Sequence, residues 1–170
     1  MKTLFAFLLF AVVLATSCDD QSITKSESVE DYIQQLKTNQ YQSDILPSFT
    51  YQEIPFLLAY RNDSHVISTF PRNTISSYYQ PECTLGMYAL WTIESIRLVA
   101  INADSVRQRF PSQNPVLALR NSNELVLVSD SASHALAADA YFDWWTNNQN
   151  KDFAIVKYID PLGNTDYFWH

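Results

Sequence analysis

The chain begins with an unbroken apolar run, Leu4–Leu14, which follows Lys2 and leads into small residues. A basic start, an apolar stretch and small residues are typical of a secretion signal. The run holds 11 residues, too few to cross a bilayer, which takes about 20. We therefore predict a signal peptide over residues 1–17, a polar tether over 18–27 and a single globular domain over 28–170.

Helical spacing of apolar residues dominates the rest of the chain. After Ser28, a capping residue, hydrophobic positions three and four apart predict a first helix. Thr50 and Glu53 form a second capping pair, which precedes a short helix ending near Tyr60. These patterns predict a mainly α, compact multi-helix domain.

The most apolar stretch predicts a central, buried helix over residues 81–102, with a proline in its first turn. Gly86 is expected at a point of close approach between helices. Glu94 and Arg97 are the charges inside this helix, one turn apart. They predict a structural ion pair with each other or with Arg61, and the alternative is a functional pocket around them.

Short apolar runs flank a last helix, which Ser131 or Ser133 is expected to cap. The runs VLALR (116–120) and LVLVS (125–129) look like a small hairpin, but periodicity alone does not separate short strands from buried helix. The runs FAIVKYI and DYFWH flank a turn at 161–164 and predict a β-hairpin near the C-terminus. Between the helices, the apolar but aperiodic residues 61–80 predict an ordered loop that covers the core.

Glycine and basic residues are scarce, and each shortage excludes classes of function. Two glycines cannot build the glycine-rich loops that bind dinucleotides or phosphates, so no cofactor is predicted. Once Lys2 leaves with the signal, 10 of the 11 basic residues remain against 18 acidic ones, with no run of Lys or Arg. We therefore expect no nucleic-acid partner.

The two cysteines, Cys18 and Cys83, are not expected to form a disulfide with each other. Cys18 stands where the predicted signal ends, ahead of the tether, which disfavours a disulfide to Cys83. Cys83 lies near a predicted helix start, where the dipole lowers a thiol pKa, and His65 or His134 is the candidate base. The alternative, which we favour, is a buried structural thiol.

The remaining candidates for chemistry are histidines and paired carboxylates. His65, His134 and His170 lack the spacing of a metal site, so none is predicted. Asp139 and Asp143, four apart on the last helix, are either an acid/base pair or part of a solvated polar face. We favour the solvated face, because the opposite side of this helix is clearly apolar.

Aromatic residues gather in YFDWW (141–145) and at the C-terminus. One helix cannot bury all the rings of YFDWW on one side, so Phe142 or Trp145 should meet the C-terminal segment or solvent. An exposed Trp beside Asp and Asn suits stacking on a sugar ring, whereas packing on the C-terminal segment is the alternative. The candidate ligand-binding residues are therefore Tyr141, Phe142, Trp145 and Trp169.

ATSCDD, FPRNTISSYY, LWTIESIR, YFDWW and PLGNTDYFWH are similar to sequences in a family of short, functionally uncharacterised lipoproteins of Bacteroides-type bacteria. The resemblance implies that Cys18 is acylated on its thiol and becomes the first residue after cleavage. Ala15 stands where the usual lipobox has Leu. The acidic residues after Cys18 resemble a surface-export signal of that group, whereas in enteric bacteria Asp19 implies retention at the inner membrane.

The leading hypothesis is an exported lipoprotein of the cell envelope, held at the outer membrane by Cys18 and binding a glycan or an envelope protein without catalysis. It depends on the predicted anchor and on the lack of a catalytic motif. The first alternative is a small hydrolase with a site centred on Cys83. The second is an immunity-type or structural envelope protein.

Overall fold

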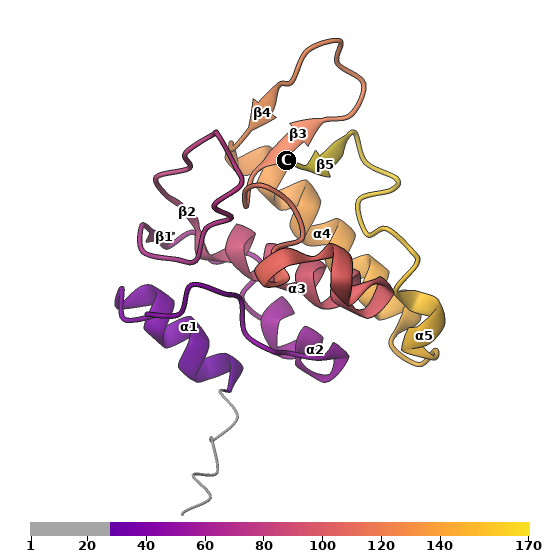
Figure 1. The fold of residues 1–170 in the computed structure, drawn as a ribbon. Coiled ribbons are helices and arrows are strands. Elements are labelled where there is room, and N and C mark those ends of the chain that lie inside the picture. Colours follow the sequence, from indigo (N-terminus) through magenta and orange to yellow (C-terminus); the bar gives the residue numbers. More distant parts are fainter. Residues whose placement is uncertain (1–27) are drawn as a thin grey trace, which may run out of the picture.

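The computed structural model describes residues 28–170, apart from the side chains of Ser105 and Arg107. The predicted signal peptide and tether, including Cys18, lie outside the described residues. The elements, in chain order, are α1 (Val29–Lys37), η1 (Tyr51–Glu53), α2 (Ile54–Leu58), β1 (Val66–Ile67), β2 (Cys83–Thr84), α3 (Leu85–Ile101), η2 (Ala103–Ser105), η3 (Arg107–Arg109), β3 (Leu117–Leu119), β4 (Leu127–Val128), α4 (Ser131–Asn148), α5 (Phe153–Val156) and β5 (Tyr167–Trp169) (Figure 1).

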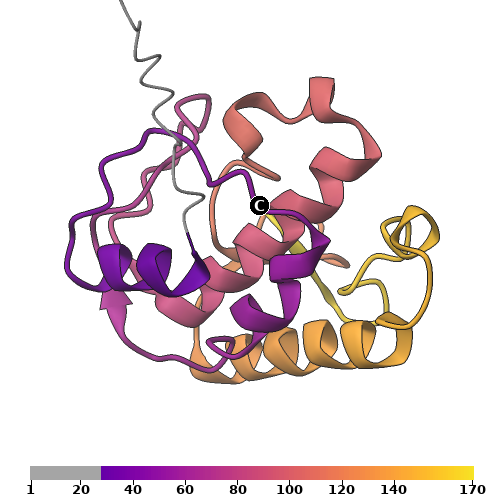
Figure 2. The ribbon, with the colours of Figure 1, turned by 90° about the horizontal axis from the view of Figure 1, so that it is seen from below.

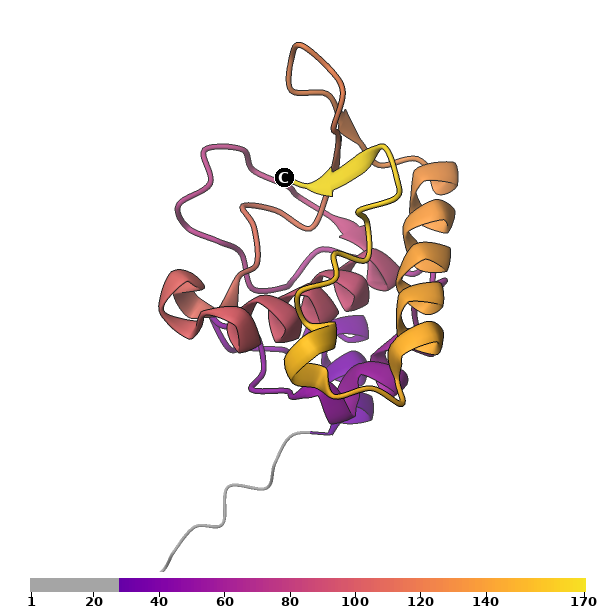
Figure 3. The ribbon, with the colours of Figure 1, turned by 90° about the vertical axis from the view of Figure 1, so that its right-hand side faces the viewer.

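Helix α3 is the centre of the domain. Every residue from Leu85 to Arg97 is buried, as predicted for a helix that is apolar on all sides. Helices α1, α2 and α4 lie around it, the β1–β2 sheet lies beside α1 and the start of α3, and β3, β4 and β5 lie at the end of the molecule opposite α2 (Figures 1 and 3). The prediction of a central helix in this region is therefore confirmed.

Two predicted helix starts are present with the expected hydrogen bonds. The Ser28 side chain accepts from the backbone N–H of Asp31 at the start of α1. Thr50 and Glu53 form a complete capping box before α2, in which the Glu53 carboxylate accepts from the Thr50 N–H. Such caps satisfy N–H groups that have no partner within a helix, so local sequence is sufficient to specify them.

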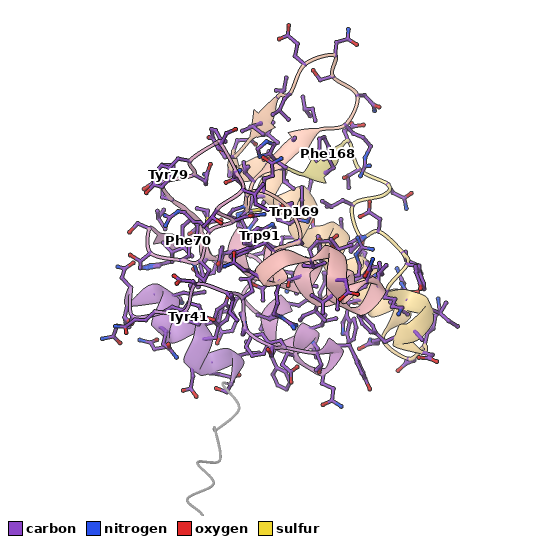
Figure 4. All side chains as sticks on the ribbon, viewed as in Figure 1. Tyr41, Phe70, Tyr79, Trp91, Phe168 and Trp169 are labelled. Atoms are coloured by element: carbon purple, nitrogen blue, oxygen red, sulfur yellow. The ribbon has the colours of Figure 1, made fainter. Side chains whose placement is uncertain are left out.

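A chain of aromatic rings fills the core between the helices. Trp91 stacks on Phe110 at 5.5 Å and also contacts Tyr88, whose ring contacts Phe70. Figure 4 shows Phe70 and Trp91 within the body of the domain and Tyr79 at its edge. Ile67 and Phe70 are buried, so part of the 61–80 segment covers the core, as predicted.

The described residues form a helix-rich mixed fold with two small antiparallel sheets, rather than a mainly α domain. Strand β1 pairs with β2, and the second sheet has the order β4–β3–β5. The runs VLALR and LVLVS are strands: Leu117 lies opposite Val128 in the antiparallel pair. The open choice between strand and helix at these runs is thus decided by pairing.

The predicted C-terminal hairpin is wrong. FAIV forms the short helix α5, because the Asp152 side chain caps it by accepting from the Ala154 N–H. Strand β5 instead pairs with β3, with Trp169 opposite Leu117. The strand partner of the C-terminal segment therefore lies about 50 residues earlier in the chain. A turn signal in the sequence predicts only the pairing of the two segments that directly flank it.

The start of α3 also differs from the prediction. Cys83 pairs with Ile67 in the β1–β2 sheet, and the helix begins at Leu85, with Thr84 as its cap. The N–H groups of Leu85 and Gly86 donate to the backbone oxygens of His65 and Asp63. Long-range hydrogen bonds thus hold the chain extended where local signals favour an earlier helix start. The cap of α4 is Asp130, rather than Ser131 or Ser133.

Candidate functional site

A pocket of about 330 Å³ lies where the β1–β2 sheet meets β4 and the first turns of α3 and α4. Its size is at the lower end of the range for small-ligand sites, roughly 300–1,000 Å³. Its wall combines apolar side chains with hydroxyl groups and carboxylates. It is lined by Ser64, Val66, Gln80, Glu82, Cys83, Thr84, Met87, Val116, Val128, Ser129, Asp130, Ser131, Ser133 and His134.

His134 joins three segments at the base of this pocket. Its Nε2 lies 2.7 Å from the backbone oxygen of Arg61. A carbonyl oxygen only accepts, so Nε2 carries the proton and donates. Its Nδ1 lies 3.3 Å from the Thr84 hydroxyl, from which it accepts in the neutral ring. The imidazole is therefore held in one orientation from both sides.

Gly86 makes this arrangement sterically feasible. A Cβ at residue 86 would lie 2.5 Å from the Arg61 oxygen and 2.7 Å from His134 Nε2. The close approach predicted at Gly86 is therefore present, but it is to the carbonyl before β1 and to an imidazole from α4. The expected contact between two helix backbones is not what Gly86 accommodates.

Backbone N–H groups at the starts of α3 and α4, beside the pocket, already donate hydrogen bonds to side chains of the protein. The Asp130 Oδ1 accepts from the N–H groups of Ala132 and Ser133 at 2.9 Å each. The Thr84 hydroxyl accepts from the Met87 N–H at 3.3 Å. Helix starts bind anions through free N–H groups, and these N–H groups already have partners.

The charged residues on the wall are acidic. The hydrogen bond from the Ser133 N–H lowers the pKa of the Asp130 carboxyl below its usual value of 3.8, and so does the bond from Ala132. Asp130 is therefore ionised at neutral pH, and Glu82 adds a second carboxylate to the wall. The lining includes no Lys or Arg, so the wall disfavours anionic ligands.

Cys83 lies in the pocket wall, but its chemistry is that of a core residue. Only 9% of the residue is exposed, and burial raises the pKa of its thiol well above the usual 9.0. The thiol stays protonated at neutral pH, whereas the nucleophile in cysteine catalysis is the thiolate. His65 is exposed and His134 is engaged by Thr84 and Arg61.

We expect the thiol of Cys83 to be unreactive in the folded protein. In a Cys18→Ser variant Cys83 is the only thiol, so alkylation by iodoacetamide reports on it alone. Mass spectrometry should find no adduct at neutral pH and complete modification in denaturant, because unfolding removes the desolvation that keeps the thiol protonated. Rapid alkylation of the native protein would contradict the buried position.

Of the four aromatic residues predicted to bind a ligand, three are buried or packed against the core and one, Phe142, is exposed. Tyr141 is fully buried, and its hydroxyl accepts from Trp169 Nε1 at 2.8 Å. Phe142 is 42% exposed, and the Arg61 guanidinium lies 4.2 Å from the centre of its ring. Trp145 is partly buried against the core and contacts Trp144. None of the four lines the pocket at His134.

Glu94 and Arg97 form a buried ion pair with each other, as predicted, and not with Arg61. The guanidinium donates to both oxygens of the Glu94 carboxylate. Tyr141 donates to the same carboxylate at 2.7 Å, and Arg97 also donates to the backbone oxygen of Lys157. This network joins α3, α4 and the segment after α5, so its role is structural.

Asp139 and Asp143 line a second groove, between α4 and the C-terminal turn. Asp160, Asn164 and Thr165 face them from that turn. Over residues 28–170, apart from the two side chains left undescribed, no three His, Cys, Asp or Glu side chains are grouped so as to hold a metal ion. The polar face predicted for α4 is therefore present, and it borders this groove.

Sequence reasoning missed the pocket at His134 because its residues come from four separate segments. The available signal was SDSASH (129–134), which places three serines and an aspartate beside His134. Of these residues, the sequence predicted a role only for Ser131 or Ser133, as a helix cap, and for His134, as a candidate base for Cys83. They also line the pocket, because β1, β2 and β4 lie against the start of the same helix, α4.

A family model described as a domain of unknown function (DUF4943) matches residues 23–170. A search of curated proteins and a search of solved structures found no match. Among the described helices, none is both long enough and apolar enough to cross a membrane.

Proposed function

Because this chain belongs to the DUF4943 family, whose function is unknown, we propose its function from the site itself. We propose that it is a lipid-anchored domain of the cell envelope. Its pocket at His134 binds a small, hydroxyl-rich ligand, namely a sugar unit of a glycan. The supporting observation is the pocket, in which hydroxyl groups and carboxylates alternate with apolar side chains. Outer-membrane location and acylation of Cys18 are parts of this proposal that come from the sequence.

The wall of the pocket matches the two faces of a sugar. A sugar presents hydroxyl groups at its edge, which bond to carboxylates, amides and hydroxyls such as those of Asp130, Gln80 and Ser131. It also presents C–H groups, which pack against apolar side chains such as Val66 and Val128. The acidic wall and the satisfied helix starts favour a neutral sugar over a phosphorylated or acidic one.

The same geometry favours binding over catalysis. The Cys83 thiol, the proposed centre of the alternative hydrolase, is kept protonated by burial. The imidazole of His134 is engaged through both nitrogens. The Thr84 hydroxyl that bonds to His134 also accepts from the Met87 N–H and caps α3, so this pair has a structural role at the start of the helix.

Binding can be tested with a glycan array, followed by calorimetry on the neutral glycans that bind. We expect Ser64→Trp to abolish binding, because Ser64 is exposed at the pocket and an indole fills space there. Ser68→Trp is the matched control: Ser68 is also exposed, four residues on, and does not line the pocket. Retained binding by Ser64→Trp, or exclusive binding of acidic glycans, would refute the proposal.

A further inference from the structure

Four large apolar side chains are exposed on three neighbouring elements. Tyr51 on η1 is 47% exposed and Phe56 on α2 is 55% exposed. Ile155 on α5 and Tyr158 just after it are each 65% exposed. We call these four residues the basal face.

The basal face belongs to the end of the domain at which the tether attaches. The described chain begins at Ser28, at the foot of the molecule, beside α2 (Figures 1 and 3). Seen from below, α1, α2 and α5 are all turned toward the viewer (Figure 2). The hairpin loop between β3 and β4 projects from the opposite end.

Local contacts hold this face in place and engage its polar neighbours. Tyr51 stacks on Phe153 at 5.2 Å, which ties η1 to α5. The nearby carboxylates of Glu53 and Asp152 are used as helix caps. The Lys157 amine lies 5.2 Å from the ring centre of Tyr158 and donates to the backbone oxygen of Ala100. The face is thus apolar, with one amine and two carboxylates at its edge.

We infer that the basal face rests on the lipid surface to which Cys18 is anchored, an inference that depends on the proposed acylation. Ten residue steps separate Cys18 from Ser28, so the anchor holds Ser28 within about 35 Å of the membrane. Aromatic rings with a polar tip and a Lys are the side chains that settle at the headgroup level.

This orientation turns the glycan pocket away from the membrane. The pocket lies against β4 and the first turn of α4, and α4 begins on the side of the β3–β4 hairpin, from which it runs down toward α5. A domain seated on the basal face therefore presents the pocket to the surroundings of the membrane, where a glycan can enter it.

The test uses the full-length, processed protein in vesicles of phosphatidylethanolamine and phosphatidylglycerol that contain a nitroxide-labelled lipid. A polarity-sensitive fluorophore is attached at Ala154→Cys on α5 or, as control, at Asn123→Cys in the β3–β4 loop; both residues are exposed. Cys83 is buried and an acylated Cys18 has no free thiol, so the label is specific. We expect a blue shift and quenching at position 154, with neither at position 123.

Matched substitutions test whether the apolar side chains of the basal face cause its contact with the lipid surface. Ile155→Ser with Tyr158→Ser should abolish quenching at position 154. Leu125→Ser with Val126→Ser, an exposed apolar pair in the opposite loop, should leave it unchanged. Unchanged quenching in the first pair would overturn the inference.

The mass of the mature protein separates the two proposals. A mature chain without acyl mass at Cys18 overturns the anchor and the seating together. An acylated chain whose label at position 154 stays in water overturns the seating alone. In that case the basal face is open to a partner protein, and the lipid anchor stands.

Discussion

Arg97→Met should destabilise the domain by about 3–5 kcal/mol, because it leaves the Glu94 carboxylate without its cation in the core. Glu94 is 5% exposed and Arg97 is 7% exposed, so solvent cannot replace the lost hydrogen bonds. The free energy of unfolding in urea, followed by circular dichroism, measures the loss. We expect no comparable loss when an ion pair at the surface is broken.

Two further variants serve as controls for this prediction. Arg120→Met removes the pair with Asp160, whose side chains are 40% and 44% exposed, and should cost at most about 1 kcal/mol. Glu94→Leu combined with Arg97→Met removes both buried charges and should recover part of the stability lost by the single variant. If Arg97→Met costs no more than Arg120→Met, the buried network does not stabilise the fold.

Gly86→Ala should cost about 1–3 kcal/mol, although Ala is the better helix former by about 1 kcal/mol. The new Cβ would lie 2.5 Å from the backbone oxygen of Arg61 and 2.7 Å from His134 Nε2. Either α3 moves away from the Arg61 backbone or the imidazole loses its hydrogen bond to that oxygen. Urea unfolding measures the cost, and the glycan titration shows whether the pocket changes with it.

Gly163→Ala provides the matched control for Gly86→Ala. Its Cβ would meet the Asp160 oxygen at 3.1 Å, a milder contact than the 2.5 Å at Gly86, and Gly163 itself is exposed. We expect a change within about 0.5 kcal/mol. Gly86→Ala with His134→Ala should recover only part of the loss, because the clash with the Arg61 backbone remains. Equal effects at the two glycines would refute the steric argument.

The basal face and the pocket at His134 lie on different elements. The basal face is carried by η1, α2 and the segment of α5, whereas the pocket is lined from β1, β2, β4 and the starts of α3 and α4. Exposed apolar side chains are also present beside the pocket, at Val66, and in the β3–β4 loop, at Leu125. The two surfaces can be disrupted independently, because no residue of the basal face lines the pocket.

The sequence alone determined the features whose causes lie within a few residues. The caps at Ser28 and Thr50 and the pairing of Glu94 with Arg97 all depend on neighbours within one helical turn. Hydrogen bonds between such close neighbours form at little cost in loop entropy, so the local pattern was sufficient.

Only the tertiary structure decided the pairing of strands and the candidate site. β5 pairs with β3, whose residues lie about 50 positions earlier in the chain. Pairing with Ile67 holds Cys83 in an extended conformation, so α3 begins only at Leu85. His134 meets the oxygen of Arg61, which is 73 positions away in sequence. A short strand gains its hydrogen bonds from a partner that periodicity does not identify. The local pattern thus specified α1 to α4 individually but not α5, and the packing of distant segments around Gly86 created the pocket.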